Sequence, residues 1–530
     1  KVGVGATVAV AQLNNNISAG IKGGSYTDVG NVDVDAMNAL KNITVGIAAG
    51  ATVPSGSDGA SAVVEGAGVY NEVHNTTNAF IEGNGSDDKV EITTVDGGSV
   101  DVIAQDVAIA ENSIYEQALD RLADGKEEIA KRMGSDFDIT GSKEIAGSES
   151  ENIKGIDMSD AANQLGENES ININKDSGSS IITVAGGLAA TTGKGAGGAA
   201  VAITDIENNY TANVEYADIT AEKLNAEAGS DSNIVTVSGG IAAASKGSGV
   251  GSITWNDVEN TAKANIKDSV VNAQAASANA SNTAQIISVA GQISGAGKAG
   301  VGATLSYIGL DNSTEANITN TRFDKRDQEE TEGITVTADT ENRSDSYNIA
   351  AGVSAAGTAA VSGNVAVTQT HGTSGAVIDG AIINNAKAVS AHALDDTDIL
   401  SVIGTVSAAG TASVGAGVAY TEIGSTSTNE DDAQQTVAEV KNTNITTVGN
   451  SEINAKAEDD SRVINVAVGI GGAGTAAVQG ASATSLINKT TGAELTNTNI
   501  DKDSANSKNA NVTVEAVNDT EITSSADVAA

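Results

Sequence analysis

Two-residue alternation of side-chain type recurs along most of the chain and has the period of a β-strand. Gly, Asn, Asp and Ser fill the joints between the alternating segments, as turn geometry requires. The chain has a single Pro, a residue that would remove a donor from a strand ladder. The pattern therefore predicts an all-β protein of short strands and turns. The alternation with Ala, Thr or Ser is clearest at Val201 and Ile203, Ile253 and Trp255, Leu305 and Tyr307, and Val365 and Val367.

A glycine- and alanine-rich segment recurs in the chain and defines a repeat. The copy VAGGLAATTGKGAGG begins at Val184, and an early copy begins at Ile43. Further copies begin at Val237, Val289, Ile349, Val402 and Val466. From Val184 onward the starting points are 53, 52, 60, 53 and 64 residues apart, so the unit has about 52–64 residues. A polar patch followed by Ala and an aliphatic residue keeps the same order at Ala212, Ala264, Ala316, Ala376 and Ala493.

Tandem units of this kind predict a β-solenoid, because a small unit cannot bury a face alone and its copies must stack. We expect two or three rungs per unit. Eight units at about 4.8 Å per rung would then give a rod on the order of 80–115 Å long. Residues 1–10 match the segment that starts at Lys298, in the middle of a unit, and the last residues match the opening of another glycine segment. We therefore expect a piece of a longer array.

One stretch interrupts the repeat. Repeats are expected at 1–110 and at 178–530, as one continuous rod, with an insertion at 111–177. Inside the insertion, NSIYEQALDRLADGKEEIAKRM has apolar residues at helical spacing, and Ser113-x-x-Glu116 has the form of a capping box. A helical segment followed by polar loop is expected there. It is either a tolerated surface insertion or a protrusion that binds a partner. The same two alternatives apply to smaller loops at about 320–333 and 424–436.

Charge and composition narrow the classes of protein. The chain has 28 Lys and Arg against 69 Asp and Glu, a formal net charge of −41. Nucleic acids and acidic membranes need a positive surface, so neither is expected as a partner. No run of about 18 apolar residues is present, so no membrane-spanning helix is predicted. Aromatic residues make up only 2% of the chain, which indicates a core of small and β-branched side chains. The absence of Cys excludes disulfides and thiolate metal sites.

The glycine segment resembles a phosphate-binding loop only in part. A Walker loop has four residues between its glycines, followed by Lys and a Ser or Thr. Here Gly187 and Gly193 enclose five residues, and Lys194 is followed by Gly. The lysine returns as Lys246 and Lys298 in later copies, which is typical of architecture rather than catalysis. We predict a turn between two strands, with Lys194 pointing to water and no nucleotide bound.

The three histidines suggest no catalytic centre. His74 and His371 stand five residues before the Ala of the polar patch, and His392 lies elsewhere. An exposed turn that accepts any polar residue is the simplest interpretation of this position. Without a Ser/His/Asp or Cys/His arrangement, nucleophilic catalysis has no candidate. Other units place Glu207, Glu259, Asp311 and Asn488 at the position of His74.

Two further kinds of chemistry stay open without assigned residues. The first is calcium binding. With several rungs per unit, Glu207, Glu259 and Asp311 would lie about 10–15 Å apart, too far to share a calcium ion. A carbohydrate-cleaving β-helix would need a carboxylate pair in a groove and usually aromatic platforms for the sugar. The only Trp, Trp255, shares its strand position with Ile203 and Tyr307, which indicates packing. We therefore predict no enzyme, and no catalytic, cofactor or metal-binding residues.

The glycine-alanine segment, the NNT-x-A-x-I type patch and the V-x-A-x-(N/D) approach together resemble the passenger repeats of large bacterial filamentous adhesins. The likeness is to the leukotoxin-type filamentous adhesin family and, in style, to haemagglutinin-like autotransporter passengers. It covers nearly the whole chain outside 111–176. It implies a right-handed parallel β-helix, secretion through an outer-membrane transporter β-barrel, and display at the bacterial cell surface, anchored through a region outside this chain.

This resemblance yields a functional expectation. We expect a non-enzymatic, extracellular adhesin stalk that attaches to other bacteria, or to a host-cell or matrix protein or glycan. The alternative is a self-associating structural filament or surface-layer component, whose partner is another copy of itself. A carbohydrate-active β-helix enzyme is the less favoured alternative.

Overall fold

The computed structural model describes residues 2–52, 61–107, 179–326, 333–425, 433–502 and 509–530. These residues form strands, turns and short connections, which confirms the all-β prediction. The strands of the two sheets pair in parallel. The whole of the insertion expected at 111–177, including its helical segment, lies outside the described residues. The centres of the loops expected near 320–333 and 424–436 also lie outside them.

The first sheet has ten strands, eight of which lie side by side in one series. That series is β1 (Val2–Lys22), β5 (Ala62–Glu82), β9 (Gly195–Glu215), β12 (Gly247–Lys267), β15 (Ala299–Thr319), β18 (Ala359–Asp379), β20 (Ala412–Ile423) and β23 (Ala476–Ile487). The other two strands are β21 (Gln434–Lys441) and β24 (Lys489–Thr496).

The second sheet has sixteen strands and faces the first. Its long strands are β11 (Lys223–Ala244), β14 (Ala275–Ala296), β17 (Ile334–Ala356), β19 (Ile382–Ala409), β22 (Asn444–Ala473) and β26 (Asn511–Ala529). Strands of intermediate length are β3 (Val32–Asn38), β4 (Leu40–Thr52), β7 (Ser99–Asp106) and β8 (Ser179–Thr191). Short strands at one end are β2 (Ser25–Val29), β6 (Val90–Thr94), β10 (Ala217–Thr220), β13 (Val270–Ala273), β16 (Arg322–Lys325) and β25 (Asn499–Lys502).

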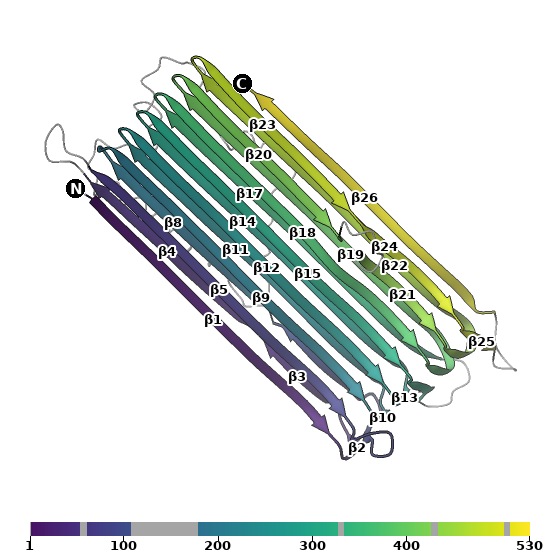
Figure 1. Ribbon diagram of the computed structural model, residues 1–530. Helices are drawn as coiled ribbons and strands as arrows, with labels where there is room; N and C mark the ends of the chain where they lie inside the picture. Colours follow the sequence, from purple (N-terminus) through teal and green to yellow (C-terminus); the bar gives the residue numbers. More distant parts are fainter. Residues whose placement is uncertain (1, 53–60, 108–178, 327–332, 426–432, 503–508) are drawn as a thin grey trace.

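The chain advances across the molecule one coil at a time, where a coil is a long strand in each sheet joined by a short strand (Figure 1). Gly247 of β12 pairs with Gly195 of β9 and with Ala299 of β15, so residues 52 positions apart in the sequence lie in adjacent coils. The expectation of two or three rungs per unit is therefore wrong. Eight adjacent strands at about 4.8 Å extend over only about 34 Å, roughly half the length of a 21-residue strand, so the rod expected from the sequence is too long.

The sequence landmarks lie opposite one another in this register. Val237 pairs with Val184 and Val289, the first residues of neighbouring glycine segments, and Ala264 pairs with Ala212 and Ala316 of the polar patch. Ala212, Ala264 and Ala316 are fully buried. A column of small side chains thus runs through the core in the direction in which the coils stack.

The residue after each long strand of the first sheet turns the chain towards a short strand. Asp268 and Asn320 take left-handed backbone conformations, with φ of 48° and 49°. Asp and Asn tolerate this region better than most residues. The turn places the short strands across the wide end of the molecule, where the main apolar core gathers Ile, Val and Ala side chains from all parts of the coil.

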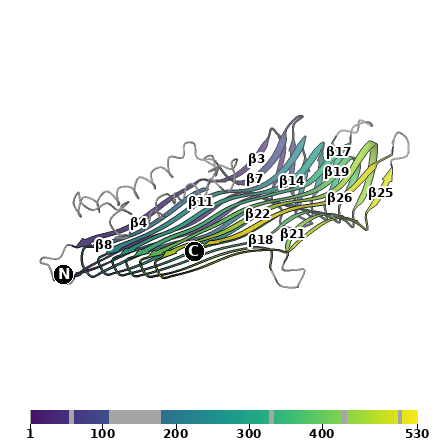
Figure 2. The same cartoon turned by 90° about the horizontal axis from the view of Figure 1, so that it is seen from above.

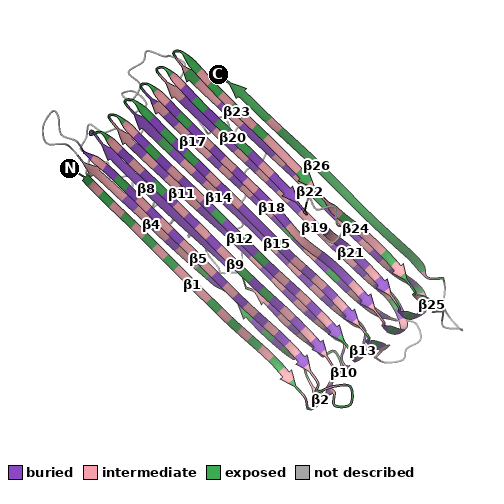
Figure 3. Ribbon diagram, viewed as in Figure 1, coloured by how far each residue is buried: buried purple, intermediate pink, exposed green. Residues whose placement is uncertain are grey.

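The two sheets lie closest at the opposite end, where β8 turns into β9 (Figure 2). A Cβ added to Gly187 would lie 2.0 Å from the backbone oxygen of Ala199 in the facing sheet. Only small side chains fit between the sheets here. Thr254 and Ser306 point inward and are fully buried, whereas Trp255 points outward and is 40% exposed. The two-residue period predicted from the sequence is confirmed (Figure 3). The packing expected for Trp255 takes place on the outer surface, against the ring of Tyr307, and not in the core.

The narrow part of the interior is held by hydrogen bonds between small polar side chains. Asn208 Nδ2 donates to Asn260 Oδ1 at 2.8 Å, and Asn260 Nδ2 donates to Asn312 Oδ1 at 3.0 Å. Asn15 and Asn75 continue this ladder towards the N-terminus. Asn75, Asn208, Asn260 and Asn312 each both donate and accept, so the burial of these amides is offset by hydrogen bonding.

Candidate functional site

The outward face of the first sheet carries the residues that the sequence analysis singled out as polar candidates. His74, Glu207, Glu259, Asp311 and His371 are consecutive strand partners from β5 to β18. They lie within long strands, so the exposed turn expected at this position is wrong. The fourth alternative, Asn488, lies between β23 and β24, where its backbone N–H donates to the carbonyl of Ile423 at 2.8 Å.

A second column of acidic residues lies two positions earlier on the same strands. Glu72 pairs with Asp205, and Asp205 pairs with Asp257. In the first column, Glu207, Glu259 and Asp311 were expected to lie about 10–15 Å apart. They lie on neighbouring strands instead, about 4.8 Å apart at the backbone. We call these six residues the acidic band: Glu72, Asp205, Glu207, Asp257, Glu259 and Asp311.

Burial, and then the crowding of like charges, raises the pKa of two carboxyls in the acidic band. Burial raises the pKa of Glu259 above its usual value, and the Asp311 and Glu207 carboxylates raise it further. The pKa of Asp257 is raised in the same way, by burial and then by Asp205 and Asp311. Repulsion within the band favours a cationic partner, because a nearby positive charge would stabilise the ionised carboxylates.

His74 lies at the edge of the acidic band and bridges two of its carboxylates. Its Nδ1 lies 2.8 Å from Glu207 Oε2, and its Nε2 lies 3.0 Å from Glu72 Oε1. These hydrogen bonds raise the pKa of His74, with the bond to Glu207 contributing most. His392 has a similar arrangement on the second sheet, between Asp339 and Glu458, and its pKa is also raised. Each imidazole thus lies between two carboxylates that favour its protonated form; Glu72 and Glu207 lie in adjacent coils, whereas Asp339 and Glu458 lie on the strands on either side of β19.

Aromatic side chains border the acidic band. The rings of Trp255 and Tyr307 stack with their centroids 4.0 Å apart. Trp255 is the strand partner of Ile203 on one side and of Tyr307 on the other. The shared strand position expected for Ile203, Trp255 and Tyr307 is thus confirmed, on the outside of the sheet. Tyr70 and Tyr420 occupy the same column in β5 and β20.

The glycine-lysine step forms the turn between the sheets, as predicted. β8 ends at Thr191 and β9 begins at Gly195, and Lys194 between them is exposed. In the following coils Lys246 and Lys298 are exposed in the equivalent turns. The N–H of Lys298 donates to the carbonyl of Lys246 at 3.0 Å, so the ladder of backbone hydrogen bonds continues around the turns. We call Lys194, Lys246 and Lys298 the lysine row.

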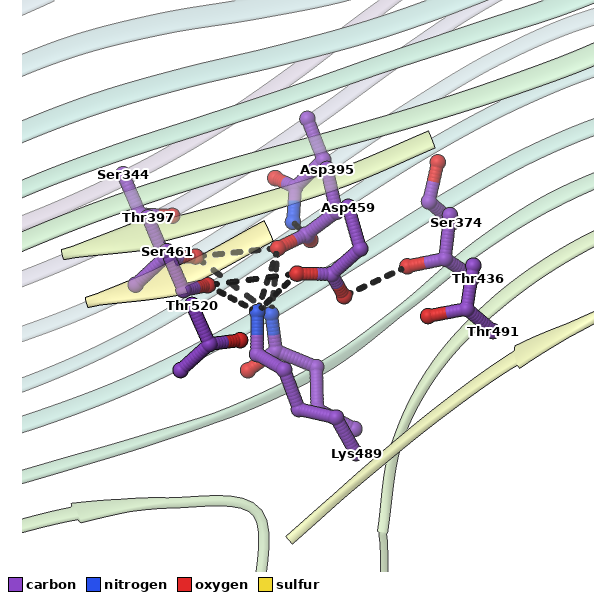
Figure 4. Close-up of polar contacts among 12 residues, drawn as sticks. Ser344, Ser374, Asp395, Thr397, Thr436, Asp459, Ser461, Lys489, Thr491 and Thr520 are labelled. Atoms are coloured by element: carbon purple, nitrogen blue, oxygen red, sulfur yellow. Dashed lines mark hydrogen bonds and ion pairs between the residues drawn. The ribbon is translucent and has the colours of Figure 1, made fainter. Parts of the chain in front are cut away.

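A buried ion cluster lies between the last coils, and the sequence pattern did not indicate it (Figure 4). Lys489 Nζ lies 2.7 Å from Asp459 Oδ1 and 3.4 Å from Asp395 Oδ1, and its side chain is 2% exposed. Asp395 also accepts hydrogen bonds from Asn342 and Gln434, both at 2.6 Å. Burial raises the pKa of Asp459, against the lowering influence of Lys489. The alternation of inward and outward positions along the strands could have indicated this cluster. Asp395 and Asp459 are the strand partners that follow Asn342, and all three side chains point inward.

One surface hollow of about 300 Å³ lies at the corner of the coils, over the short strands. Its lining includes Lys89, Asp268 and Arg322, and Asp268 is the one carboxylate among the residues that line it. A glycosidase of the usual kind needs two carboxylates facing each other across the substrate. In the part of the chain that the structure describes, no group of three or more His, Asp or Glu side chains is arranged to hold a metal ion.

Comparison with known proteins gives no match to this chain among protein-family models, curated proteins or solved structures. Within the described ranges, no helix is long and apolar enough to cross a membrane.

Proposed function

We propose that the protein is a non-enzymatic adhesive stalk: a right-handed β-solenoid of tandem 52–64-residue repeats, secreted and displayed at the bacterial cell surface, that attaches to a host-cell or matrix protein or glycan. The observation that carries the proposal is the register of the coils. Because equivalent residues pair strand by strand, a feature of one repeat becomes a continuous column on an outer face. Such extended, ordered surfaces are what solenoids use for binding.

The acidic band is the part of this surface best suited to contact a partner. Glu207 and Glu259 are exposed and lie next to each other on β9 and β12, with exposed Asp311 beyond them on β15. The band favours a basic segment of a matrix or cell-surface protein, because complementary charge steers association and fixes register.

Binding of the purified chain to immobilised matrix proteins and to host cells tests this proposal. The triple variant Glu207→Gln, Glu259→Gln, Asp311→Asn should weaken binding by about tenfold or more and reduce its salt dependence. A matched control changes three exposed acids of the second sheet, Glu515, Asp519 and Glu521 of β26, to amides and should leave binding unchanged. Equal binding by both variants would contradict the role of the band. Release of reducing sugar ends from polysaccharides would instead support the enzymatic alternative.

A self-associating filament is the second candidate function. It is favoured by an uncharged surface on the outside of the first sheet, formed by alternate residues of neighbouring strand segments such as 247–255 and 299–307. End-to-end or lateral assembly of the chain, without binding to cells or matrix, would support it over adhesion.

A further inference from the structure

A broad outer surface of the first sheet is apolar and has nothing packed on it among the described residues. It consists of five outward positions on each of eight neighbouring strands, and none of them has a charged side chain. Val4, Val64, Val301 and Val478 form one of its columns, and their exposed fractions are 75%, 52%, 50% and 62%. We call this surface the apolar face. It comprises alternate residues of 2–10, 62–70, 195–203, 247–255, 299–307, 359–367, 412–420 and 476–484.

The apolar face is larger than the largest apolar patch that a typical isolated protein leaves exposed. Four two-residue steps along a strand span about 27 Å, and eight strands span about 34 Å, so the face covers roughly 900 Å². The largest patch on a typical monomer is about 300–600 Å². Two such faces in contact would bury about 1,800 Å² in total, close to the standard size of a stable protein interface.

We propose that two copies of this chain pack through their apolar faces, with strands antiparallel and coils in matching order. The two-fold axis would run along the direction in which the coils stack, through the column of Gly251, so that each coil meets the same coil of the second copy. This pairing goes beyond the adhesive function proposed above and does not depend on it.

Side-chain sizes on the apolar face fit this arrangement. With Gly251 on the axis, the second copy's Gly247 lies opposite Trp255, and its Gly249 lies opposite Ile253. In the next coil, the second copy's Ala299 lies opposite Tyr307. Large side chains thus meet small ones, which is how packed layers interdigitate. Gly249 and Gly251 have ordinary backbone conformations, and a Cβ on either would meet open space, so no contact among the described residues requires glycine there.

Charge at the two borders of the apolar face also fits. The lysine row lies just before the first apolar position of its strands, and Asp205 and Asp257 lie just after the last. In the antiparallel arrangement, Lys246 of one copy lies beside Asp257 of the other, and Lys194 lies beside Asp205. The interface would therefore have an apolar centre and complementary charges at its rim, in a chain whose net charge of −41 otherwise opposes association.

Analytical ultracentrifugation of the full chain tests the pairing, with acrylamide quenching of Trp255 as a second readout. We expect a dimer of about 105 kDa, twice the 52.5 kDa of one chain, with Trp255 protected as the dimer forms. Gly251→Lys places two like charges opposite each other on the axis and should raise the dissociation constant by at least about 100-fold. Thr261→Lys, on the same strand and the same outer surface but beyond the acidic band, is the matched control and should leave it unchanged. Circular dichroism establishes that both variants fold.

Charge reversal tests the antiparallel arrangement itself. Lys194→Glu with Lys246→Glu should weaken the dimer, and adding Asp205→Lys with Asp257→Lys should restore it. A chain that stays monomeric, or a Gly251→Lys dimer as tight as that of Thr261→Lys, overturns the proposal. A monomer that instead binds neutral lipid vesicles would show that the apolar face meets a lipid surface. Loss of dimers without loss of cell binding separates this proposal from the adhesive function.

Discussion

Replacing Lys489 with Met should destabilise the C-terminal coils strongly. The substitution keeps a long apolar stem but leaves Asp395 and Asp459, whose side chains are fully buried, without their cation. Removing one partner of a buried ion pair costs about 3–5 kcal/mol, because the remaining charge stays desolvated. Asp395 retains hydrogen bonds from Asn342, Thr397 and Gln434, which places the expected loss near the lower end of that range.

Urea unfolding followed by circular dichroism measures the loss, and hydrogen exchange of amides in β22 and β24 locates it. The control is Lys502→Met, which removes an exposed lysine from the last coil and should change stability by less than about 0.5 kcal/mol. Adding Asp459→Asn to Lys489→Met should recover part of the loss, since it removes one of the two buried charges. A loss for Lys489→Met no larger than for Lys502→Met would refute the reasoning.

Three further predictions concern single side chains. The pKa of His74, measured by NMR titration, should lie above that of a free histidine and fall in Glu207→Gln; an unchanged value in that variant would contradict the assigned hydrogen bond. Burial and the neighbouring Asp398 and Asp460 raise the pKa of Asp396 to about 6, so the protonated form is favoured in the folded state and stability should fall as pH rises from about 4 to 6. Because Asp396 is partly solvated, its share of the loss should be only about 1 kcal/mol. Asp396→Asn should remove that share, while other carboxyls with a raised pKa, such as Asp257 and Glu259, keep theirs. Asn260→Ala breaks the amide ladder on both sides and should cost about 2–3 kcal/mol in urea unfolding, whereas Asn265→Ala, on the outside of the same strand, should cost under about 1.

The sequence alone predicts the strands, their two-residue period and the turns at Lys194 and its equivalents, because these depend on local residue patterns. It does not predict which face of a strand points inward. In most strands the larger apolar residues mark the core, whereas here Trp255 and Tyr307 point outward. The reason is the close approach of the sheets near Gly187, which leaves room inside only for side chains such as Thr254 and Ser306.

The sequence pattern also did not predict that each repeat forms a single coil. Glycines inside 21-residue strands such as β12 have the local sequence pattern of turns. A prediction from the sequence therefore divides each long strand into several short ones. Once Gly247 is paired with Gly195, columns of residues that are far apart in the sequence become neighbours. The acidic band, the apolar face and the buried Lys489 all follow from that register.

The most direct test of the account is therefore the register of adjacent coils, measured by disulfide formation in a chain that has no cysteine of its own. Thr261 and Ser313 are direct strand partners, and Ser313 pairs in turn with Thr373. The double variant Thr261→Cys, Ser313→Cys should form an intramolecular disulfide on mild oxidation, because its Cα atoms lie within the roughly 4.4–6.8 Å that a disulfide spans. Thr261→Cys with Thr373→Cys, two coils apart, should not form one. Crosslinking of the second pair, or failure of the first in a folded protein, would contradict one coil per repeat.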